Sequence, residues 1–545
     1  MRAMKMNYPI SKTPLVLAAL VTIALLLTLP AYAAAPGITG PTFKLTAQDA
    51  YISQPDGQMI YSWGYGCTGT PAGYAPAAIK NTFCNSMQVP GPTLIVTAGD
   101  SVSVTLTNKL PAAAGNTSIL FPSFQVTGTG GVAGLLTQEA QPGGSVTYTF
   151  QASTVGTHAY YSGTQGDLQV EMGLYGAIIV LPAKIPSNCT NPAIATNLYT
   201  VSKPYKQEQD FRLAASAYDH ATTCYDREYL FQFSEIDPNI HLQAEAQVAA
   251  ANCTPDPQTH ALPSTCSLQV PTEPYRPAYF MINGRSMPDD MDPNYAPEYP
   301  HQPYNGNPHM HPGEQVLLRI IGQGRWQHPF HEHGNHVRIL ARDGNLILST
   351  TNPSDPNLAG PLLFTTTTTP GLAMDGIYYW TGRGLNWDPY GHHAAYTDSA
   401  GIFHPAQDPG CTPDANGYNS GSGAYGAINY YEWCADHNKP VESAPFGDVA
   451  GGGPVTLPDP NLFTNGAWYG GSPYLGPDAT GRAVGPTGTT PPSGTIANPP
   501  GSEAGFAFMW HSHNEREITT NNAFPGGMMM MMLVDSREFV IDESN

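Results

Sequence analysis

Basic side chains are scarce in this chain, and their scarcity argues against one broad class of function. Only 22 of the 545 residues are Lys or Arg, against 42 Asp and Glu, which gives a formal net charge of −20 at pH 7. Proteins that bind nucleic acid hold its phosphates with clustered Lys and Arg side chains. The sequence has no such cluster, so we expect no nucleic-acid partner.

Long apolar runs are also missing, except near the N-terminus. There PLVLAALVTIALLLTLPA follows three basic residues and precedes an Ala-Tyr-Ala that ends at Ala33. This order is typical of a cleaved signal peptide. We therefore expect residues 1–33 to direct the protein to a secreted, periplasmic or cell-surface location. An uncleaved anchor is the alternative, because the run is close to the lower length for spanning a bilayer.

Cys-x-x-Cys pairs are absent, which argues against a zinc ribbon or a dithiol redox site. The eight cysteines form an even set in a chain that we expect to be exported, and this indicates four disulfides. Pairing in sequence order is the simplest arrangement, although eight cysteines allow many others. That order joins Cys67 to Cys84, Cys189 to Cys224, Cys253 to Cys266, and Cys411 to Cys434.

Helical periodicity is missing from the first 185 residues, where apolar and polar residues alternate in short stretches instead. TLIVTAGDSVSVTLTNKL alternates on both sides of Gly99-Asp100, a turn signal between strands. A second strand-rich block begins at REYLFQFSEID and ends with AGFAFMWHSH and GGMMMMMLVD. Many short strands at this spacing predict an all-β chain of sandwiches or barrels.

The stretch between about residues 350 and 503 differs in composition from the rest. It is rich in Gly, Pro, Ser and Thr, as in VGPTGTTPPSG, and it has few apolar runs from which to build a core. We therefore expect a long insertion rather than a separate third domain. The expected organisation is a signal peptide over 1–33, a first domain over 38–185 and a second domain over 195–545.

Two His-x-His pairs are the strongest candidates for metal ligands. His331 and His333 lie in HPFHEHG, and His511 and His513 lie in WHSH. Residues i and i+2 of a strand face the same side, so two such pairs on neighbouring strands would gather four imidazoles. Imidazole suits copper, zinc, iron and nickel. Histidines that are hydrogen-bonded within a core are the alternative interpretation.

Several motifs together resemble the multicopper oxidases. PGPTLIVTAGDSVSVTLTN resembles their opening strands, and TQEAQPGGSVTYTF with GTHAYYSGTQGDLQVEMGLYGAIIV resembles the end of their first domain. GEQVLLRIIGQG and HPFHEHG resemble their last-domain motif His-Pro-x-His-x-His-Gly. The resemblance covers most of the chain outside the insertion. It implies two cupredoxin-like Greek-key β-sandwich domains, with the Gly/Pro-rich insertion in the second.

The resemblance also implies roles for single residues. This family holds a three-copper cluster with four His-x-His pairs, and a separate electron-accepting copper with a cysteine between two of those histidines. By this resemblance His331, His333, His511 and His513 would face the cluster. His328 is a further candidate, as a ligand of the electron-accepting copper.

The chain departs from the family pattern at both centres. The cysteine is replaced by Ser512, and Glu517 stands where a second histidine of that centre is expected. A hydroxyl is a hard donor and does not replace a soft thiolate. The two first-domain pairs correspond to TSILFPSF and GTHAYYSG, in which their four positions are Leu120, Pro122, Tyr161 and Gly163.

We therefore predict an exported multicopper-oxidase-like protein that binds one metal ion at the second-domain histidines. Copper is the expected ion, with zinc or another transition metal as alternatives. Oxidoreductase activity toward a small-molecule reductant is compatible with such a site, but a laccase-type blue centre is not. A non-catalytic copper carrier and a structural surface protein on a degenerate scaffold are the alternatives. The sequence leaves the catalytic residues, the reductant and homo-oligomer formation open.

Overall fold

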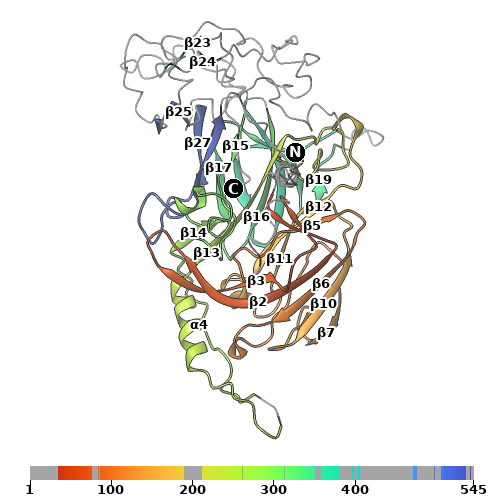
Figure 1. The fold of residues 1–545 in the computed structure, drawn as a ribbon, viewed down its shortest axis with the longest axis vertical. Coiled ribbons are helices and arrows are strands. Elements are labelled where there is room, and N and C mark those ends of the chain that lie inside the picture. The colour runs from red at the N-terminus through yellow and green to blue at the C-terminus, as the bar shows by residue number, and fades with distance from the viewer. Residues whose placement is uncertain are drawn as a thin grey trace, which may run out of the picture.

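The computed structural model describes the chain in several ranges. These are residues 35–76, 84, 86–189, 211–259, 262–311, 314–349, 357–380 and 505–535, with residues 396–397, 401, 403–404, 471–475, 496–497 and 541. Within them the chain is built mainly of strands in four large sheets (Figure 1). The expected all-β class is therefore confirmed. No helix in these ranges is long and apolar enough to cross a membrane.

The first domain is a sandwich of two five-stranded sheets that share one core. One sheet has the order β11 (Gly156–Tyr161), β12 (Tyr175–Leu181), β5 (Leu94–Thr97), β1 (Gly37–Thr39) and β4 (Gly73–Ala75). The other has the order β3 (Met59–Cys67), β2 (Thr42–Ser53), β6 (Ser101–Asn108), β10 (Ser145–Gln151) and β7 (Thr127–Gly130). Buried apolar and more exposed polar residues alternate along β6 and β10, so each strand turns one face to the core. On that face Val104 lies opposite Tyr148.

The second domain is a sandwich of two larger sheets. One contains β14 (Tyr279–Ile282), β13 (Arg227–Ile236), β16 (Gln315–Gly322), β22 (Ala373–Tyr379), β18 (Val337–Arg342), β19 (Asn345–Leu346) and β20 (Leu362–Leu363). The other contains β15 (His309–Met310), β28 (Met529–Asp535), β27 (Gly505–Ser512), β17 (His328–Glu332), β21 (Thr365–Thr368), β25 (Gly471–Leu475) and β26 (Ile496–Ala497). Aromatic residues and methionines fill the core, including Phe330, Trp510 and Met530.

The remaining elements are short, apart from one helix. They are the strands β8 (Val132–Ala133), β9 (Gln138–Glu139), β23 (Tyr396–Thr397) and β24 (Phe403–His404), the helix α2 (Gly166–Gln169) and the 3-10 turns at Ala112–Ala114, Ser187–Cys189 and Asp289–Met291. The longer helix, α4 (Pro238–Ala250), extends beside the first domain (Figure 1). It begins with Pro238 after Asp237, whose side chain accepts from the Asn239 N–H at 3.0 Å.

The domain boundaries remain predictions. Strands of the first sandwich run from residue 37 to 181, and those of the second run from 227 to 535. The expected signal peptide over 1–33 and most of the expected insertion over 350–503 lie outside the described residues. Within that insertion, β25 pairs with β27 and so extends a second-domain sheet.

A buried group of polar side chains joins the two domains. Asp375 on β22 accepts from the backbone N–H and the hydroxyl of Thr157 on β11, at 3.1 and 2.6 Å, and from the Tyr218 hydroxyl at 2.5 Å. Arg319 on β16 donates to Glu228 at 2.6 Å and to the Thr157 hydroxyl at 3.1 Å. These five side chains are buried. The joint is therefore stabilised by hydrogen bonds between charged and polar groups as well as by apolar contact.

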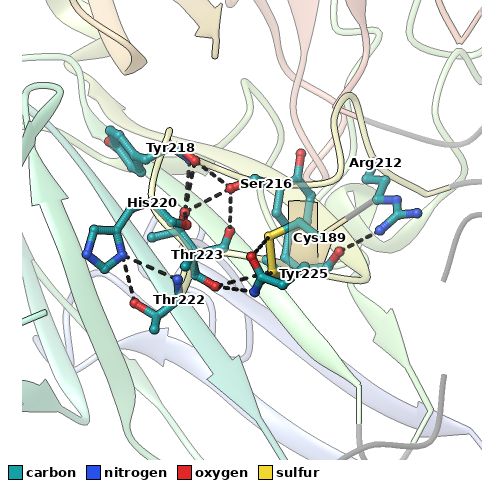
Figure 2. The surroundings of a disulfide bond; sticks show 11 residues. Cys189, Arg212, Ser216, Tyr218, His220, Thr222, Thr223 and Tyr225 are labelled. Atoms are coloured by element: carbon teal, nitrogen blue, oxygen red, sulfur yellow. Dashed lines mark hydrogen bonds between the residues drawn. A yellow bond between two sulfur atoms is a disulfide. The ribbon is translucent and has the colours of Figure 1, made fainter. Parts of the chain in front are cut away.

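Three disulfides confirm the expected pairing within the described residues. They join Cys67 to Cys84, Cys189 to Cys224 and Cys253 to Cys266, and no described cysteine is free. Figure 2 shows that the Cys189 bridge lies beside a loop in which Ser216 and Thr223 are hydrogen-bonded through their hydroxyls at 2.9 Å. The expected bridge between Cys411 and Cys434 lies outside the described residues.

Candidate metal centre

The structure brings the two second-domain His-x-His pairs together. Strands β17 and β27 are antiparallel neighbours, and His331 lies directly opposite His511. His333 and His513 follow at the ends of these strands. The ring centre of His331 lies 4.7 Å from that of His333, 5.7 Å from that of His511 and 5.1 Å from that of His513. The ring of His511 lies 5.2 Å from His333 and 5.4 Å from His513.

These separations suit ligands that share one metal ion, although the rings do not yet converge. With metal–nitrogen bonds of about 2 Å, imidazoles in tetrahedral coordination have ring centres roughly 5 Å apart. Most of the ring pairs pack edge to face. Among the residues that the structure describes, no three His, Cys, Asp or Glu side chains are already arranged to hold a metal ion. A metal ion would therefore require these rings to rotate.

The environment keeps two of the rings neutral. Burial, reinforced by the neighbouring His333, His511 and His513, lowers the pKa of His331 to about 4. Burial also lowers the pKa of His511. Both rings therefore carry an unprotonated nitrogen near pH 7, which a metal ion needs. The side chain of His513 is 55% exposed, which makes it the member of the cluster most open to solvent.

Hydrogen bonds fix which nitrogen of His511 is available. Its Nδ1 lies 2.7 Å from the backbone oxygen of Ser512, and this oxygen can only accept, so Nδ1 carries the proton. Nε2 of the neutral ring then has a lone pair, which faces Nε2 of His333 at 3.3 Å. The lone pair of His511 is thus directed into the cluster. Nδ1 of His331 is held by the Thr365 hydroxyl at 2.8 Å.

Two buried aromatic side chains that the sequence did not single out hold the backbone of the cluster. The Trp510 indole N–H donates to the His333 backbone oxygen at 2.9 Å, and the Tyr378 hydroxyl donates to the same oxygen at 3.2 Å. Glu332, between the two histidines, accepts from the Thr366 hydroxyl at 2.9 Å. Burial raises the pKa of Glu332 to about 8. Long-range pairing determines these contacts, so a local motif does not reveal them.

His328 does not join the other four histidines. Its Nδ1 lies 2.9 Å from Glu517 and its Nε2 lies 3.0 Å from Glu235, and all three side chains are buried. The Ser512 hydroxyl donates to the same Glu517 oxygen at 2.5 Å. Burial lowers the pKa of His328, but the hydrogen bonds to Glu235 and Glu517 outweigh it and raise the pKa to about 9. The ring is therefore an imidazolium that donates from both nitrogens.

The position of the family's electron-accepting copper is thus filled by a hydrogen-bonded network. By the resemblance, Ser512, Glu517 and His328 stand where a cysteine and two histidines would bind that ion. Neither nitrogen of His328 has a lone pair while both donate to carboxylates. These residues do not fit a blue copper ion.

The first-domain positions are equally unsuited to copper. Leu120 and Tyr161 pair through their backbones, with N–O distances of 2.7 and 3.3 Å. The Leu120 side chain fills the space beside Gly163, where an added Cβ would lie 2.7 Å from Leu120 Cγ. A cleft of about 320 Å³ opens here, and Leu120, Pro122 and Tyr161 help to line it. Among the described residues, no imidazole lines this cleft, so the residues do not fit a three-copper cluster.

Two family models match the chain, over residues 74–185 and 271–377, and both are described as multicopper oxidase. The chain is a divergent member of the multicopper oxidase family. Laccase abr2 of Aspergillus fumigatus is 37% identical over 118 residues, which are 21% of this chain and 19% of that protein. L-ascorbate oxidase of Brassica rapa subsp. pekinensis is 39% identical over 100 residues, 18% of this chain and 17% of that protein. The chain thus matches less than a fifth of the length of these relatives.

Solved structures of multicopper oxidases are also similar to this family member. Multicopper oxidase mgLAC aligns with 92% of this chain and 87% of its own, at 15% identity and a TM-score of 0.41. A blue copper oxidase from Nitrosomonas europaea aligns with 90% of this chain and 85% of its own, at 15% identity and a TM-score of 0.40. Membership of the family implies copper as the cofactor; the number of copper ions depends on the residues described above.

Proposed function

We propose that this multicopper oxidase family member is an exported protein that binds a single copper ion through His331, His333, His511 and His513. The observation that supports the proposal is that the pairing of β17 with β27 gathers four imidazoles whose neighbouring ring centres lie 4.7–5.7 Å apart. Neutral rings at positions 331 and 511 support it, because only unprotonated imidazole binds metal.

The bound copper ion would supply one-electron redox chemistry. The chain's own residues hold it in place: the four imidazoles provide the ligands, while Trp510 and Tyr378 fix the backbone at His333. The exposed His513 leaves one side of the cluster open to a small-molecule reductant. Four-electron reduction of dioxygen is not expected, because neither a three-copper cluster nor a blue copper ion fits the residues present.

Copper carriage without catalysis is the second candidate. It is favoured by the same half-exposed His513, because a ligand at the surface allows the ion to be passed to another protein. Export of the protein rests on the expected signal peptide over 1–33 and agrees with the three disulfides.

Metal analysis of the purified, copper-loaded protein tests the proposal. We expect at most one tightly bound copper per chain, nitrogen hyperfine coupling in the electron paramagnetic resonance spectrum, and no intense blue absorption. The double variant His331→Ala/His513→Ala should lose the ion and stay folded, while His220→Ala in a distant loop should keep it. Retention of copper by the double variant, or three or four coppers per wild-type chain, would contradict the proposal. Oxygen consumption with a reductant then separates the oxidoreductase from the carrier.

A further inference from the structure

Ser123 and His158 form a hydrogen-bonded pair in the first domain, far along the chain from the histidine cluster. Ser123 lies in the loop before β7, and His158 lies on β11. The Ser123 Oγ is 2.9 Å from His158 Nδ1, and His158 Nε2 is 2.9 Å from the backbone oxygen of Thr154. The Thr154 oxygen can only accept, so Nε2 carries the ring proton of neutral His158. Nδ1 is then the acceptor, and the Ser123 hydroxyl donates to it.

The surroundings keep His158 neutral and fix its orientation toward Ser123. The ring is buried, and burial lowers its pKa below the ordinary value, although the hydrogen bond to Thr154 opposes this. Phe124 packs against the ring edge to face at 5.0 Å. From the second domain Gly344 approaches so closely that an added Cβ would lie 2.6 Å from His158 Cε1. A base that is neutral, fixed and oriented by a third group is the arrangement that activates a serine nucleophile.

The hydroxyl of this pair lies at a cleft that can admit a substrate. Ser123 lines an open cleft of about 610 Å³ together with Pro122, Phe124, Gln125, Gln151 and Ser153. Pro122 and Phe124 also line the neighbouring apolar cleft of about 320 Å³, which Tyr161 borders. Within the part of the chain that the structure describes, no charged side chain lines either cleft, and the net charge of −20 repels anions. The clefts therefore suit a small, uncharged molecule with an apolar part.

We propose that Ser123 and His158 are a nucleophile and its general base, and that they hydrolyse small uncharged esters. Ser123 Oγ bonds to the ester carbonyl carbon while His158 Nδ1 takes the hydroxyl proton. The bond from that carbon to the ester oxygen then breaks, and the leaving alkoxide takes the proton from Nδ1 and departs as an alcohol. The side-chain amides of Gln125 and Gln151 line the same cleft and are the donors available to the carbonyl oxygen as it becomes negative.

Water completes the reaction. It gives one proton to His158 Nδ1 and bonds to the acyl carbon, and the bond to Ser123 breaks as the proton returns to Oγ. One ester and one water thus become one carboxylic acid and one alcohol, with no oxidation or reduction. The reaction needs no metal ion, so it is independent of the proposed copper site.

Labelling of the metal-free protein tests the proposal. Chelator-treated full-length protein is incubated with a fluorophosphonate probe, and mass spectrometry locates the adduct; 4-nitrophenyl acetate hydrolysis is measured in parallel. We expect one adduct per chain, at Ser123, and a burst of nitrophenol equal to the protein concentration. Ser123→Ala should abolish both signals, and His158→Gln should slow them about 100-fold. Ser145→Ala is the control, because this exposed serine of β10 lines neither cleft, and it should keep both signals.

An absent adduct, an adduct at another residue, or equal rates for Ser123→Ala and the wild type would overturn the proposal. His158 packs against Gly344 of the second domain, so His158→Gln is compared only if its circular dichroism spectrum matches the wild type. If it does not, the pair Ser123→Ala and Ser145→Ala decides alone. Equal loss of labelling in both serine variants would also overturn the assignment. None of these outcomes depends on whether the histidine cluster binds copper.

Discussion

At the scale of single residues, the exchange of the family's cysteine for Ser512 is only one part of the loss of the blue copper site. Hydrogen bonds connect Ser512, Glu517, His328 and Glu235, and the proton on His328 provides the positive charge that a copper ion would otherwise bring. A buried carboxylate needs such a counter-charge. The substituted residues thus stabilise one another, and restoring one of them is not enough to restore the site.

Copper-loaded variants of Ser512 test this interdependence. Ser512→Cys alone should stay colourless, because His328 remains protonated between Glu517 and Glu235. Ser512→Cys/Glu517→His supplies a thiolate and a second imidazole, and it removes one of the carboxylates that hold the proton on His328. We expect intense blue absorption from this double variant only. Glu517→His alone is the control without a thiolate, and blue colour in either single variant would refute the argument.

The pKa of His328 also predicts how stability depends on pH. The folded-state pKa of about 9 lies above the ordinary value of about 6.5. The ion pair therefore stabilises the fold fully below pH 6.5, and this contribution, on the order of 3 kcal/mol, is lost as the pH rises through 9. Asp226 and Glu332 have pKa values raised by burial to about 7 and about 8, and they add a loss of the same sign.

Comparison with a variant isolates the contribution of His328 to the pH dependence of the free energy of unfolding. Free energies of unfolding measured in urea from pH 6 to 10 should fall with pH in the wild type. In His328→Gln the fall should be smaller by the His328 contribution. Below pH 9 this variant should be less stable than the wild type, because two buried carboxylates lose their counter-charge. His301→Gln, a change at a half-buried histidine near Met87, should keep the wild-type slope. Parallel curves for the wild type and His328→Gln would show that His328 does not titrate in this range.

At the scale of strands and helices, local patterns in the sequence predicted much of what is observed. The alternation around Gly99-Asp100 predicted β5 and β6, and the i, i+2 spacing of each His-x-His pair predicted two rings on one face of a strand. Period-two alternation reflects a sheet with one buried face, so it can be read locally. The observed register places His331 directly opposite His511, and this brings the two His-x-His pairs together.

Other elements lacked a readable pattern. Helix α4 buries Ile240, His241 and Ala244, which is too few apolar positions for a clear helical period, and its start depends on the Asp237 cap. The hydrogen-bond partners of His328 could not be predicted from the local sequence either. Glu235 lies 93 residues before His328 and Glu517 lies 189 residues after it. Only the assembled sheets bring these carboxylates to one ring.

At the scale of the whole molecule, the joint between the domains is the feature that is hardest to predict from the sequence. Thr157, Tyr218, Arg319 and Asp375 come from four separate parts of the chain, and each is an ordinary polar residue in its own motif. Their structural role depends on burial, because Asp375 accepts hydrogen bonds from three donors at a place where water is excluded. The joint also fixes β11 against β16 and β22, and so sets where His158 lies relative to Gly344.

Removing the carboxylate at this joint should therefore separate the stability of the molecule from its metal binding. Asp375→Ala leaves the buried Arg319 with one carboxylate fewer and leaves three donors without their acceptor, and we expect a loss of about 3–5 kcal/mol in the free energy of unfolding. Asp343→Ala is a control at an aspartate of the β18–β19 turn and should cost less. Copper stoichiometry should not change in folded Asp375→Ala, because the four histidines lie on the other sheet of the second domain. A variant that stays as stable as the wild type, or one that folds but loses its copper, would show that the joint and the metal centre are not organised as argued.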